Sequence, residues 1–289
     1  MCPPISEASS ARLRPVASPQ NALVKALREA FAKGTTVDGL CAVEGLRLLE
    51  EAIRSSVKVH ALFIRESAQN KAQRILGQLG KRAESVLLPD SVFDSAVLTE
   101  HPQGIAALVK APEYDLEAAL AKSPALVVVA AGVQDPGNFG TLVRSAEAFG
   151  GTAVIGIEGT VNPWNPKAVR GSAGSVFRLA VTKTKTEELI SALRSRQIVG
   201  LALMPPRTVD DQGVRDGSSP RSPRPLQEAD LTRACALFVG SEGAGLPREL
   251  ISRIEEFVAI PQARVESLNA AVAASIALYE AQRQRTAKL

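Results

Sequence analysis

The chain has 289 residues, of which 45% are apolar and 22% are charged, so it is long enough for two folded domains and is neither a disordered chain nor a fibrous repeat. Its net charge of +4 suits a polyanionic partner without demanding one, because the same excess also serves solubility. Three scattered cysteines without a C-x-x-C pair argue against a disulfide framework and a zinc site, and no apolar run is long enough for an export signal or a membrane span. We therefore expect a cytoplasmic protein that does not enter a membrane.

The N-terminal part predicts a tail followed by a small α/β domain. Residues 1–20 are rich in Ser, Pro and Arg, which is typical of a flexible tail, and folded structure is expected from Asn21. Helical and strand periodicities then alternate as far as residue 110. The predicted helices cover residues 21–34, 42–55, 71–80 and 91–99, and the predicted strands 57–64, 85–89 and 104–110. Residues 111–123 predict a helical linker.

Residues 124–289 predict a second and larger α/β domain. Its strands are nearly continuous apolar runs, which is typical of a parallel sheet buried on both faces. The predicted strands cover 126–131, 152–156, 197–204, 234–240 and 254–261, and the predicted helices 141–149, 186–195 and 267–284. Residues of about 205–229 are dominated by Pro and small polar residues and predict a mobile surface insertion, whose arginines are balanced by acids, so charge gives no case for RNA binding there.

The last predicted helix has a clear apolar face. Leu268, Val272, Ile276 and Tyr279 fall along one side of it, and Ser267 is placed to cap its first turn.

The loop after the first strand of the second domain carries an informative charge. In the segment Asp135–Gly140, Pro and Gly predict a turn and Asn138 is placed to cap the helix that follows. Arg144, one turn into that helix, needs an anionic or polar partner if the helix is buried. The loop matches neither G-x-G-x-x-G nor the P-loop pattern, which counts against a nicotinamide or phosphorylated cofactor.

Two further segments follow strands of the same sheet. Residues 238–247 leave a strand through three glycines, which let backbone approach a ligand closely, although a tight strand-to-helix turn explains the same pattern. Ile260-Pro261 precedes a short loop and then Ser267-Leu268-Asn269. Asn269 lies near free N–H groups at the start of the last helix, where it could face a ligand.

With these three segments in order, the chain resembles the SpoU (TrmH-like) family of the SPOUT methyltransferases. Asn138 with Arg144 is similar to the first family motif. The second motif is matched by Gly240-Ser241-Glu242-Gly243 with Gly245-Leu246, and the third by Ile260-Pro261 with Ser267-Leu268-Asn269 and Leu278-Tyr279-Glu280. Residues 170–178 resemble a family stretch on the substrate side, and residues 21–110, closing with Gln103-Gly104-Ile105, resemble the L30e-like RNA-binding domain of many members. Residues 262–265 depart from the family, which often has Met and Gly there.

The resemblance implies an enzyme that transfers a methyl group from S-adenosylmethionine to an RNA ribose 2′-hydroxyl, without a metal ion. It also implies a trefoil knot in residues 124–289 and a homodimer whose sites combine both subunits. The implied catalytic residues are Arg144, Asn138, Glu242, Ser267 and Asn269. The implied cofactor-binding residues are Leu203, Met204, Val239, Gly240, Gly245, Ile260 and Leu268. Ribosomal RNA is the preferred substrate, while transfer RNA and a non-catalytic RNA-binding protein of the same fold stay open as alternatives.

Overall fold

The computed structural model describes residues 13–79, 83–206, 223–241, 243–265 and 267–287. These residues gather in two compact units. The first contains the described residues as far as Pro112 together with Trp164–Phe177, and the second contains Glu113–Pro163 with the described residues from Arg178 onward. The region expected as one domain over 124–289 is thus interrupted, because residues 164–177 group with the first unit. No helix in the described part of the chain is long and apolar enough to cross a membrane.

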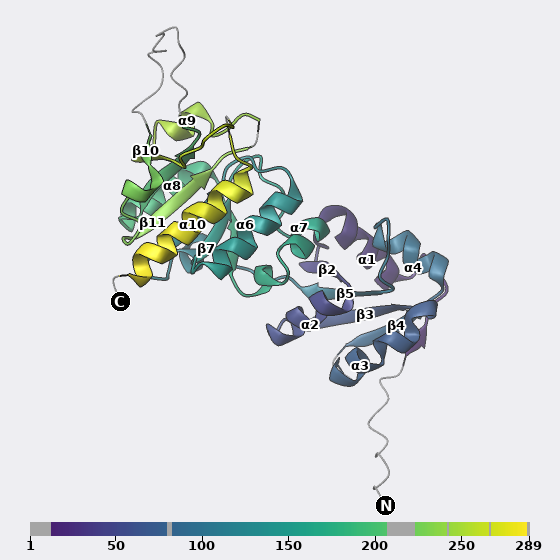
Figure 1. The fold of residues 1–289 in the computed structure, drawn as a ribbon. Coiled ribbons are helices and arrows are strands. Elements are labelled where there is room, and N and C mark those ends of the chain that lie inside the picture. Colours follow the sequence, from purple (N-terminus) through teal and green to yellow (C-terminus); the bar gives the residue numbers. More distant parts are fainter. Residues whose placement is uncertain (1–12, 80–82, 207–222, 242, 266, 288–289) are drawn as a thin grey trace, which may run out of the picture. The chain divides into compact units, whose positions relative to one another are not determined.

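The first unit is built on a mixed five-stranded sheet in the order β1-β4-β3-β5-β2. Figure 1 shows α1 and α4 on one face of this sheet and α2 and α3 on the other. The strands are β1 (Arg14–Pro15), β2 (Leu40–Glu44), β3 (Val59–Arg65), β4 (Glu84–Leu88) and β5 (Ile105–Lys110). The helices are α1 (Ala22–Lys33), α2 (Leu46–Arg54), α3 (Gln69–Leu79), α4 (Asp90–Val97) and, from the later segment, α7 (Pro166–Gly171).

Two expectations for the first unit are wrong. Ordered structure begins before Asn21, because Arg14 and Pro15 pair in parallel with Val86 and Leu87, and the next residue, Val16, is buried and donates a hydrogen bond to the Leu87 carbonyl oxygen. Residues 42–44 belong to strand β2 and not to a helix, since all five residues of β2 are buried and pair antiparallel with β5. A five-residue run buried on both faces carries no alternation, so its strand character was hidden by the helix that follows.

The second unit is built on a seven-stranded, all-parallel sheet in the order β10-β12-β9-β11-β6-β7-β8. Its strands are β6 (Leu126–Ala130), β7 (Ala153–Gly156), β8 (Ala180–Lys183), β9 (Val199–Met204), β10 (Arg224–Pro225), β11 (Cys235–Val239) and β12 (Glu256–Ala259). Its helices are α5 (Leu116–Ala119), α6 (Pro136–Ala148), α8 (Thr186–Ser195), α9 (Arg248–Ile251) and α10 (Ala270–Thr286). The parallel sheet agrees with the expectation, while strand β8, in which only Val181 is buried, was not predicted.

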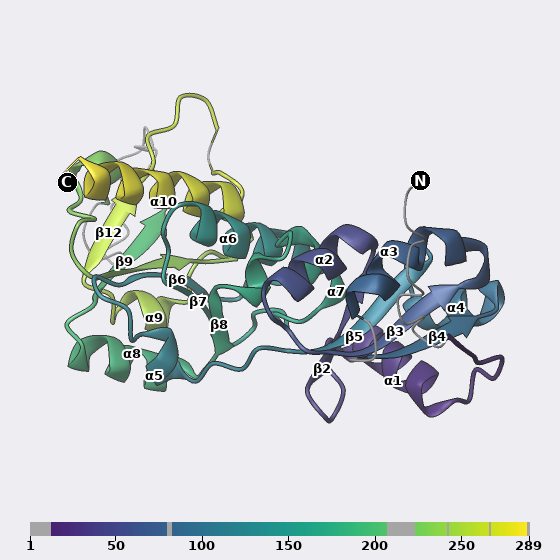
Figure 2. The same cartoon turned by 90° about the horizontal axis from the view of Figure 1, so that it is seen from below.

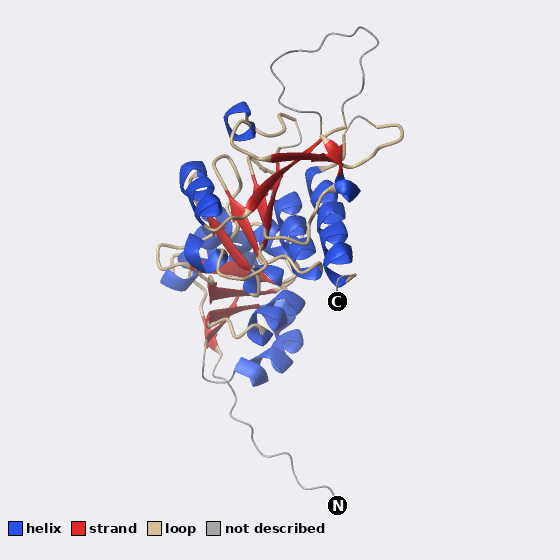
Figure 3. Ribbon diagram, turned by 90° about the vertical axis from the view of Figure 1, so that its left-hand side faces the viewer, coloured by secondary structure: helices blue, strands red, loops and turns tan. Residues whose placement is uncertain are grey.

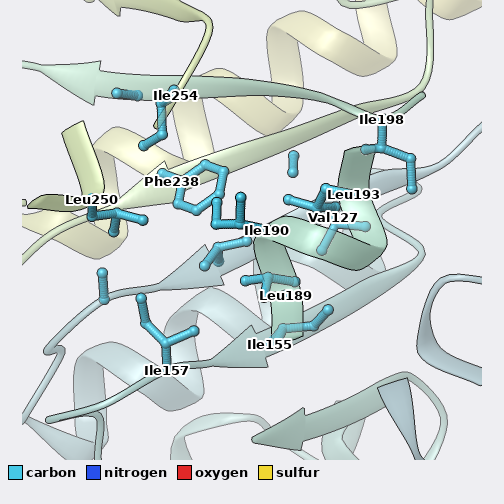
Figure 4. Packing of buried hydrophobic residues seen from close by; sticks show 14 of the residues in the cluster. Val127, Ile155, Ile157, Leu189, Ile190, Leu193, Ile198, Phe238, Leu250 and Ile254 are labelled. Carbon is cyan, nitrogen blue, oxygen red and sulfur yellow. The ribbon is translucent and has the colours of Figure 1, made fainter. Parts of the chain in front are cut away.

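Helices cover both faces of this sheet. Figure 2 shows α6 and α10 on one face and α5, α8 and α9 on the other, and the layers of helix and strand are also visible in Figure 3. Figure 4 shows the apolar contact on the α8 side, where Leu189, Ile190 and Leu193 of α8 meet Val127 and Phe238 of the central strands. Because helices cover both faces of the sheet, the strands are buried on both sides and their sequences are continuous apolar runs.

Helix α10 packs through small residues and leaves its larger apolar residues exposed. Ala270, Ala271, Ala274, Ala277, Leu278 and Ala281 are its buried residues. The face that was expected to be its apolar contact is outside the core of this chain: Val272 is 46% exposed, Ile276 37% and Tyr279 55%. The alanines allow α10 to approach α6 and β11, so the bulkier side of the helix faces outward.

The C-terminal end of α10 is anchored by one arginine. Arg285 donates hydrogen bonds to the carbonyl oxygens of Leu231, Ala125 and Arg233 at 2.9, 2.9 and 2.8 Å, and to that of Pro124 at 3.2 Å. These carbonyl groups belong to the segments that lead into β6 and β11, so the guanidinium joins the end of α10 to the start of both strands.

The structure differs in part from the expectation for two segments, the linker at residues 111–123 and the insertion at about 205–229. Of residues 111–123, only Leu116–Ala119 are helical, capped by the Asp115 side chain. In the expected insertion, Arg224–Pro225 form β10 and Leu226–Glu228 a short 3₁₀ helix, with Leu226 buried. The greater part of the expected insertion, residues 207–222, lies outside the described residues.

Candidate active site

A cavity of about 580 Å³ opens at the carboxyl ends of three neighbouring strands of the parallel sheet, β12, β9 and β11. Loops that follow parallel strands emerge at the same edge of the sheet, which is where ligands bind in open α/β folds. The wall from β9 is Leu203–Pro205, and the wall from β11 is Val239–Ser241 with Gly243–Leu246. The remaining lining residues are Arg248, Ile251, Ile260, Gln262, Ser267, Leu268, Ala270 and Ala273.

The glycine-rich loop after β11 folds back on itself. Ser241 and Gly245 exchange two backbone hydrogen bonds, of 3.1 and 3.0 Å, which bring the two ends of the loop together. A side chain at Gly240 would place its Cβ 2.2 Å from the carbonyl carbon of Gly245, and Gly245 itself has a φ of 64°. Both positions therefore require glycine for the turn alone, and the turn in addition presents backbone to the cavity.

The start of α10 is capped differently from the expectation. Asn269, and not Ser267, is the N-cap residue, and its side-chain oxygen accepts hydrogen bonds from the N–H groups of Ala271 and Val272 at 2.9 and 3.2 Å. Ser267 lies before the cap on the cavity wall. Since both Asn and Ser are favoured at the N-cap, the sequence allowed either position, and the backbone geometry selected the later one.

Helix α6 also begins earlier than expected. Asp135 is its N-cap, accepting a hydrogen bond of 2.8 Å from the N–H of Asn138, and Pro136 is its first helical residue. The expectation that Asn138 caps the helix is therefore wrong. Asn138 lies inside the first turn with its side chain directed to α10, where its Oδ1 accepts a hydrogen bond of 3.2 Å from Asn269 Nδ2. The sequence motifs that contain these two asparagines thus meet in the structure.

Arg144 lies on α6 but is not part of the cavity wall. It is the ninth residue of the helix and not in its first turn, and its side chain is exposed. The next residue, Ser145, faces α10 and shares a hydrogen bond of 2.7 Å with Ser275. Successive residues of a helix are about 100° apart, so Arg144 projects to one side of the α6–α10 contact. Among the residues that the structure describes, it has no hydrogen bond or ion pair.

The expected site residues therefore divide into three groups. All seven expected cofactor-binding residues line the cavity, and so does Ser267 among the expected catalytic ones. Asn138 and Asn269 contact each other, and Arg144 is exposed on the same helix as Asn138. Glu242 lies outside the described residues.

Gln262 was not among the expected site residues, although the segment that contains it departs from the family. Its side-chain Oε1 is buried without a hydrogen-bond partner in the described part of the chain, and the residue lines the cavity. A buried acceptor without a donor destabilises the protein by about 1–3 kcal/mol. A ligand that donates a hydrogen bond in the cavity would remove that cost. The sequence signal for such a binding role of Gln262 was that its segment departs from the family pattern.

Neither the two described cysteines nor the two histidines line this cavity. Burial raises the pKa of the Cys41 thiol to about 12 and that of Cys235 to about 11, so both thiols stay protonated at neutral pH. The two histidines, His60 and His101, lie in the first unit. Among the described residues, no cluster of three or more His, Cys, Asp or Glu side chains is placed to hold a metal ion.

The family comparisons match both parts of the chain. Residues 125–279 match the SpoU rRNA methylase family, and residues 42–115 match the substrate-binding domain of RNA 2′-O-ribose methyltransferases. The first match covers more than half of the chain and contains all of the cavity-lining residues.

Relatives and solved structures agree over nearly the whole chain. The 23S rRNA (guanosine(2553)-2′-O)-methyltransferase RlmP of Bacillus subtilis is 31% identical over 239 residues, which cover 82% of this chain and 86% of that protein. The 23S rRNA (uridine(2479)-2′-O)-methyltransferase of Streptomyces viridochromogenes is 30% identical over 84% of this chain and 82% of its own length. An AdoMet-bound rRNA methyltransferase from Sinorhizobium meliloti superposes with a TM-score of 0.76 at 26% identity, over 94% of this chain and 98% of that one.

The fold, the cavity and these matches define a two-domain RNA methyltransferase. The chain belongs to the SpoU family and carries the family's RNA substrate-binding domain at its N-terminal end. Its activity is that of an RNA ribose 2′-O-methyltransferase.

Proposed function

We propose that this protein methylates a ribose 2′-hydroxyl of 23S ribosomal RNA in the cytoplasm, using S-adenosylmethionine bound in the cavity at the ends of β9, β11 and β12. The observation that carries the proposal is that every expected cofactor residue lies on the wall of this one cavity. The choice of ribosomal RNA is supported by relatives from Bacillus subtilis and Streptomyces viridochromogenes that are named for 23S rRNA.

The cavity residues fit S-adenosylmethionine. Its volume of about 580 Å³ lies in the range of cofactor sites, and Leu203, Val239 and Ile260 give it apolar walls suited to an adenine ring. A Cβ at Gly240 would meet the Gly245 backbone, so glycine keeps the turn after β11 tight, and Gln262 has a buried oxygen that needs a donor. When bound, the cofactor supplies a methyl group on a positively charged sulfur. The chain holds it through backbone carbonyl and N–H groups of the turns after β11 and β12.

Arg144 is proposed to act on the ribose. A guanidinium stays protonated in proteins, so Arg144 stabilises the negative charge that develops on the 2′-oxygen and orients the adjacent phosphate, while the proton leaves to phosphate or water. Asn138, Asn269 and Ser267 are proposed to position the ribose, and Glu242 to accept a hydrogen bond from Arg144 or from the bound backbone. The Asn138–Asn269 hydrogen bond supports this grouping because it joins two of the proposed residues directly.

The active form is proposed to be a homodimer. Val272, Ile276 and Tyr279 follow a helical spacing along one side of α10 and are 46%, 37% and 55% exposed. Tyr279 also makes an edge contact with Phe149, whose ring lies 5.8 Å away at the end of α6. Exposed apolar residues that form one continuous stripe are typical of an interface. Because Arg144 lies on α6, whose end borders this stripe, a second copy docked there would approach Arg144.

The trefoil knot implied by the family stays a prediction.

The decisive experiment is methyl transfer in vitro. Purified protein is incubated with tritiated S-adenosylmethionine and, separately, with transcripts of 23S rRNA and of total tRNA, and modified positions are mapped by resistance of 2′-O-methylated linkages to alkaline cleavage. We expect one methylated ribose in 23S rRNA. Labelling of tRNA alone would replace the ribosomal substrate by the tRNA alternative, and labelling of a base would overturn the reaction itself. Comparison of total RNA with and without the gene then identifies the position in the cell.

A further inference from the structure

A second cavity, also of about 580 Å³, lies wholly within the first unit. One side is formed by Phe31 of α1 and by residues 98–101 after α4. The other side is formed by Asn165–Lys167, at the start of α7, and by Arg170 in its last turn. Figure 1 shows α7 beside β2, which it contacts. A segment from the middle of the chain thus completes a hollow on the substrate-binding domain.

The polar lining of this cavity is suited to a phosphate. Lys167, Arg170 and His101 are basic, and Glu100 is the one acid among its lining residues. Arg170 Nη1 lies 3.9 Å from Glu44 Oε2, close enough for an ion pair but too far for a hydrogen bond. Within the described part of the chain this guanidinium makes no hydrogen bond, so its N–H donors stay available for another group.

The buried carboxylate of Glu44 contacts both sides of the second cavity. Its carboxylate is 7% exposed, and its Oε1 accepts hydrogen bonds from Thr99 Oγ1 at 3.2 Å and from the Gln103 N–H at 2.9 Å. The same carboxylate therefore fixes the 99–103 segment and orients Arg170 on α7. A buried acid that ties together both sides of a cavity makes the cavity a preformed feature.

Leu98 is unusual in two ways at once. It ends α4 in the left-handed conformation, with a φ of 52° and a ψ of 28°, which costs a non-glycine residue about 1–2 kcal/mol. Its side chain is also 56% exposed, at the edge of the cavity. Gly or Asn would adopt this left-handed conformation at a lower cost and would expose less apolar surface to water. A leucine at this position therefore indicates a role beyond folding.

We propose that this cavity binds one unpaired nucleotide of the RNA substrate, with its phosphate at Lys167 and Arg170 and its base against Leu98 and the His101 ring. The inference rests on the proposed function for the identity of the ligand as RNA. Proteins read RNA mostly at unpaired nucleotides, whose bases they place against apolar and aromatic side chains, including His. The cavity combines such a surface with basic groups within the volume range of small-ligand sites.

The first test uses Leu98→Asn in the full-length protein. Asn tolerates the left-handed conformation, so we expect an unchanged or higher melting temperature together with an affinity for a 23S rRNA transcript that is lower by on the order of tenfold, measured by filter binding. Opposite effects on stability and on RNA binding separate a binding role from a structural one. Unchanged RNA affinity in Leu98→Asn would overturn the proposal.

The second test uses charge. Lys167→Gln should weaken binding and make the slope of log K against log [salt] less steep by about 0.7, the value for one single-strand phosphate. Lys71→Gln, an equal change of charge on the exposed side of α3, is the control and should leave both unchanged. An equal loss in the control would mean a diffuse electrostatic effect and no site.

The outcome can be separated from that of the proposed function. S-adenosylmethionine affinity, measured by calorimetry, should be the same in the wild type and in all three variants. If the wild type labels no RNA in the methyl-transfer assay, the proposed function fails whatever the RNA-binding result. If the wild type labels RNA while the Leu98 and Lys167 variants bind as it does, only the nucleotide site fails.

Discussion

Asn269 Nδ2 donates a hydrogen bond to Asn138 Oδ1 across 3.2 Å, although the two residues are 131 positions apart in the chain. The oxygen of the same Asn269 amide caps α10. One side chain therefore fixes the start of the last helix and joins it to the first turn of α6. This double use allows the two tasks to be separated by substitution.

Asn269→Asp should keep the cap and lose the hydrogen bond that is donated to Asn138 Oδ1, because a carboxylate accepts hydrogen bonds from Ala271 and Val272 but donates none. We expect a melting temperature within about 1 °C of the wild type, since Asp and Asn cap helices equally well, and methyl transfer at least about tenfold slower. Asn269→Ala is the matched comparison. Because it loses both tasks, its free energy of unfolding should fall by about 1 kcal/mol and its melting temperature by about 2–4 °C. Wild-type turnover in Asn269→Asp would show that only the cap matters.

Gln262→Met should stabilise the cofactor-free protein and weaken cofactor binding. The substitution removes a buried oxygen that has no partner among the described residues, so the melting temperature without ligand should rise by at least about 2 °C. The loss of one hydrogen bond to the ligand should raise the Kd for S-adenosylmethionine about fivefold by calorimetry. Equal affinity of the variant and the wild type would mean that Gln262 does not contact the cofactor.

Arg144→Lys should impair catalysis without affecting the cofactor site. Lysine keeps the positive charge but lacks the planar, bidentate donors of arginine, so kcat/KM for methyl transfer should fall on the order of 100-fold. The Kd for S-adenosylmethionine should not change, because Arg144 does not line the cavity. Arg194→Lys, an equally exposed change on α8, serves as control. Near-wild-type methylation by Arg144→Lys would remove the role assigned to the guanidinium.

Ile276→Glu should convert the proposed dimer into a monomer. A charge in the middle of the exposed stripe of α10 would be buried without a partner in the interface, while in the monomer it remains in water. Sedimentation equilibrium should show half the mass of the wild type, with methyl transfer lost. Val37→Glu places the same charge at a residue that is 94% exposed in the first unit and should stay dimeric. A wild-type protein that sediments as a monomer would refute the dimer.

Glu280 should give acid-dependent stability. Hydrogen bonds from Arg283, at 2.7 Å, hold the pKa of the Glu280 carboxyl below its ordinary value of 4.5, although burial opposes this. A lowered pKa in the folded state means that the carboxylate stabilises the fold above pH 4.5 and that this contribution is lost as the pH falls further. Glu280→Gln should lower the melting temperature by about 2 °C at pH 7, with the difference vanishing toward pH 3. A difference that persists at pH 3 would assign the effect to packing.

Chain-local patterns predicted most of the second unit. Its strands were visible because a parallel sheet covered on both faces needs unbroken apolar runs, and the glycine turn was visible because Gly240 and Gly245 have no substitute there. Strand β8 was not predicted, because a short edge strand with partly exposed residues carries no such run. Strand β2 was missed for another reason: its five residues are all buried and lead directly into α2, so the run was assigned to that helix, and only its pairing with β5 shows a strand.

The errors at the site have a common cause. Asn138 and Ser267 were both assigned to helix caps, and in each case a neighbouring residue of the same capping class, Asp135 or Asn269, has that role. Local propensity does not distinguish such neighbours. The backbone geometry of the turn decides between them, and the displaced residue becomes available for other contacts.

The sequence by itself determined the family, the two-part organisation, and which loops line the cavity, because those properties depend on residue types at fixed spacings. Only the tertiary structure decided that Asn138 and Asn269 touch, that α10 packs through its alanines and exposes Ile276, and that residues 164–177 join the first unit. These are outcomes of competition between surfaces that are distant in the chain. The spacing of apolar residues along a helix predicts that the helix has an apolar face. Which face is buried depends on the neighbouring surface that packs best against it.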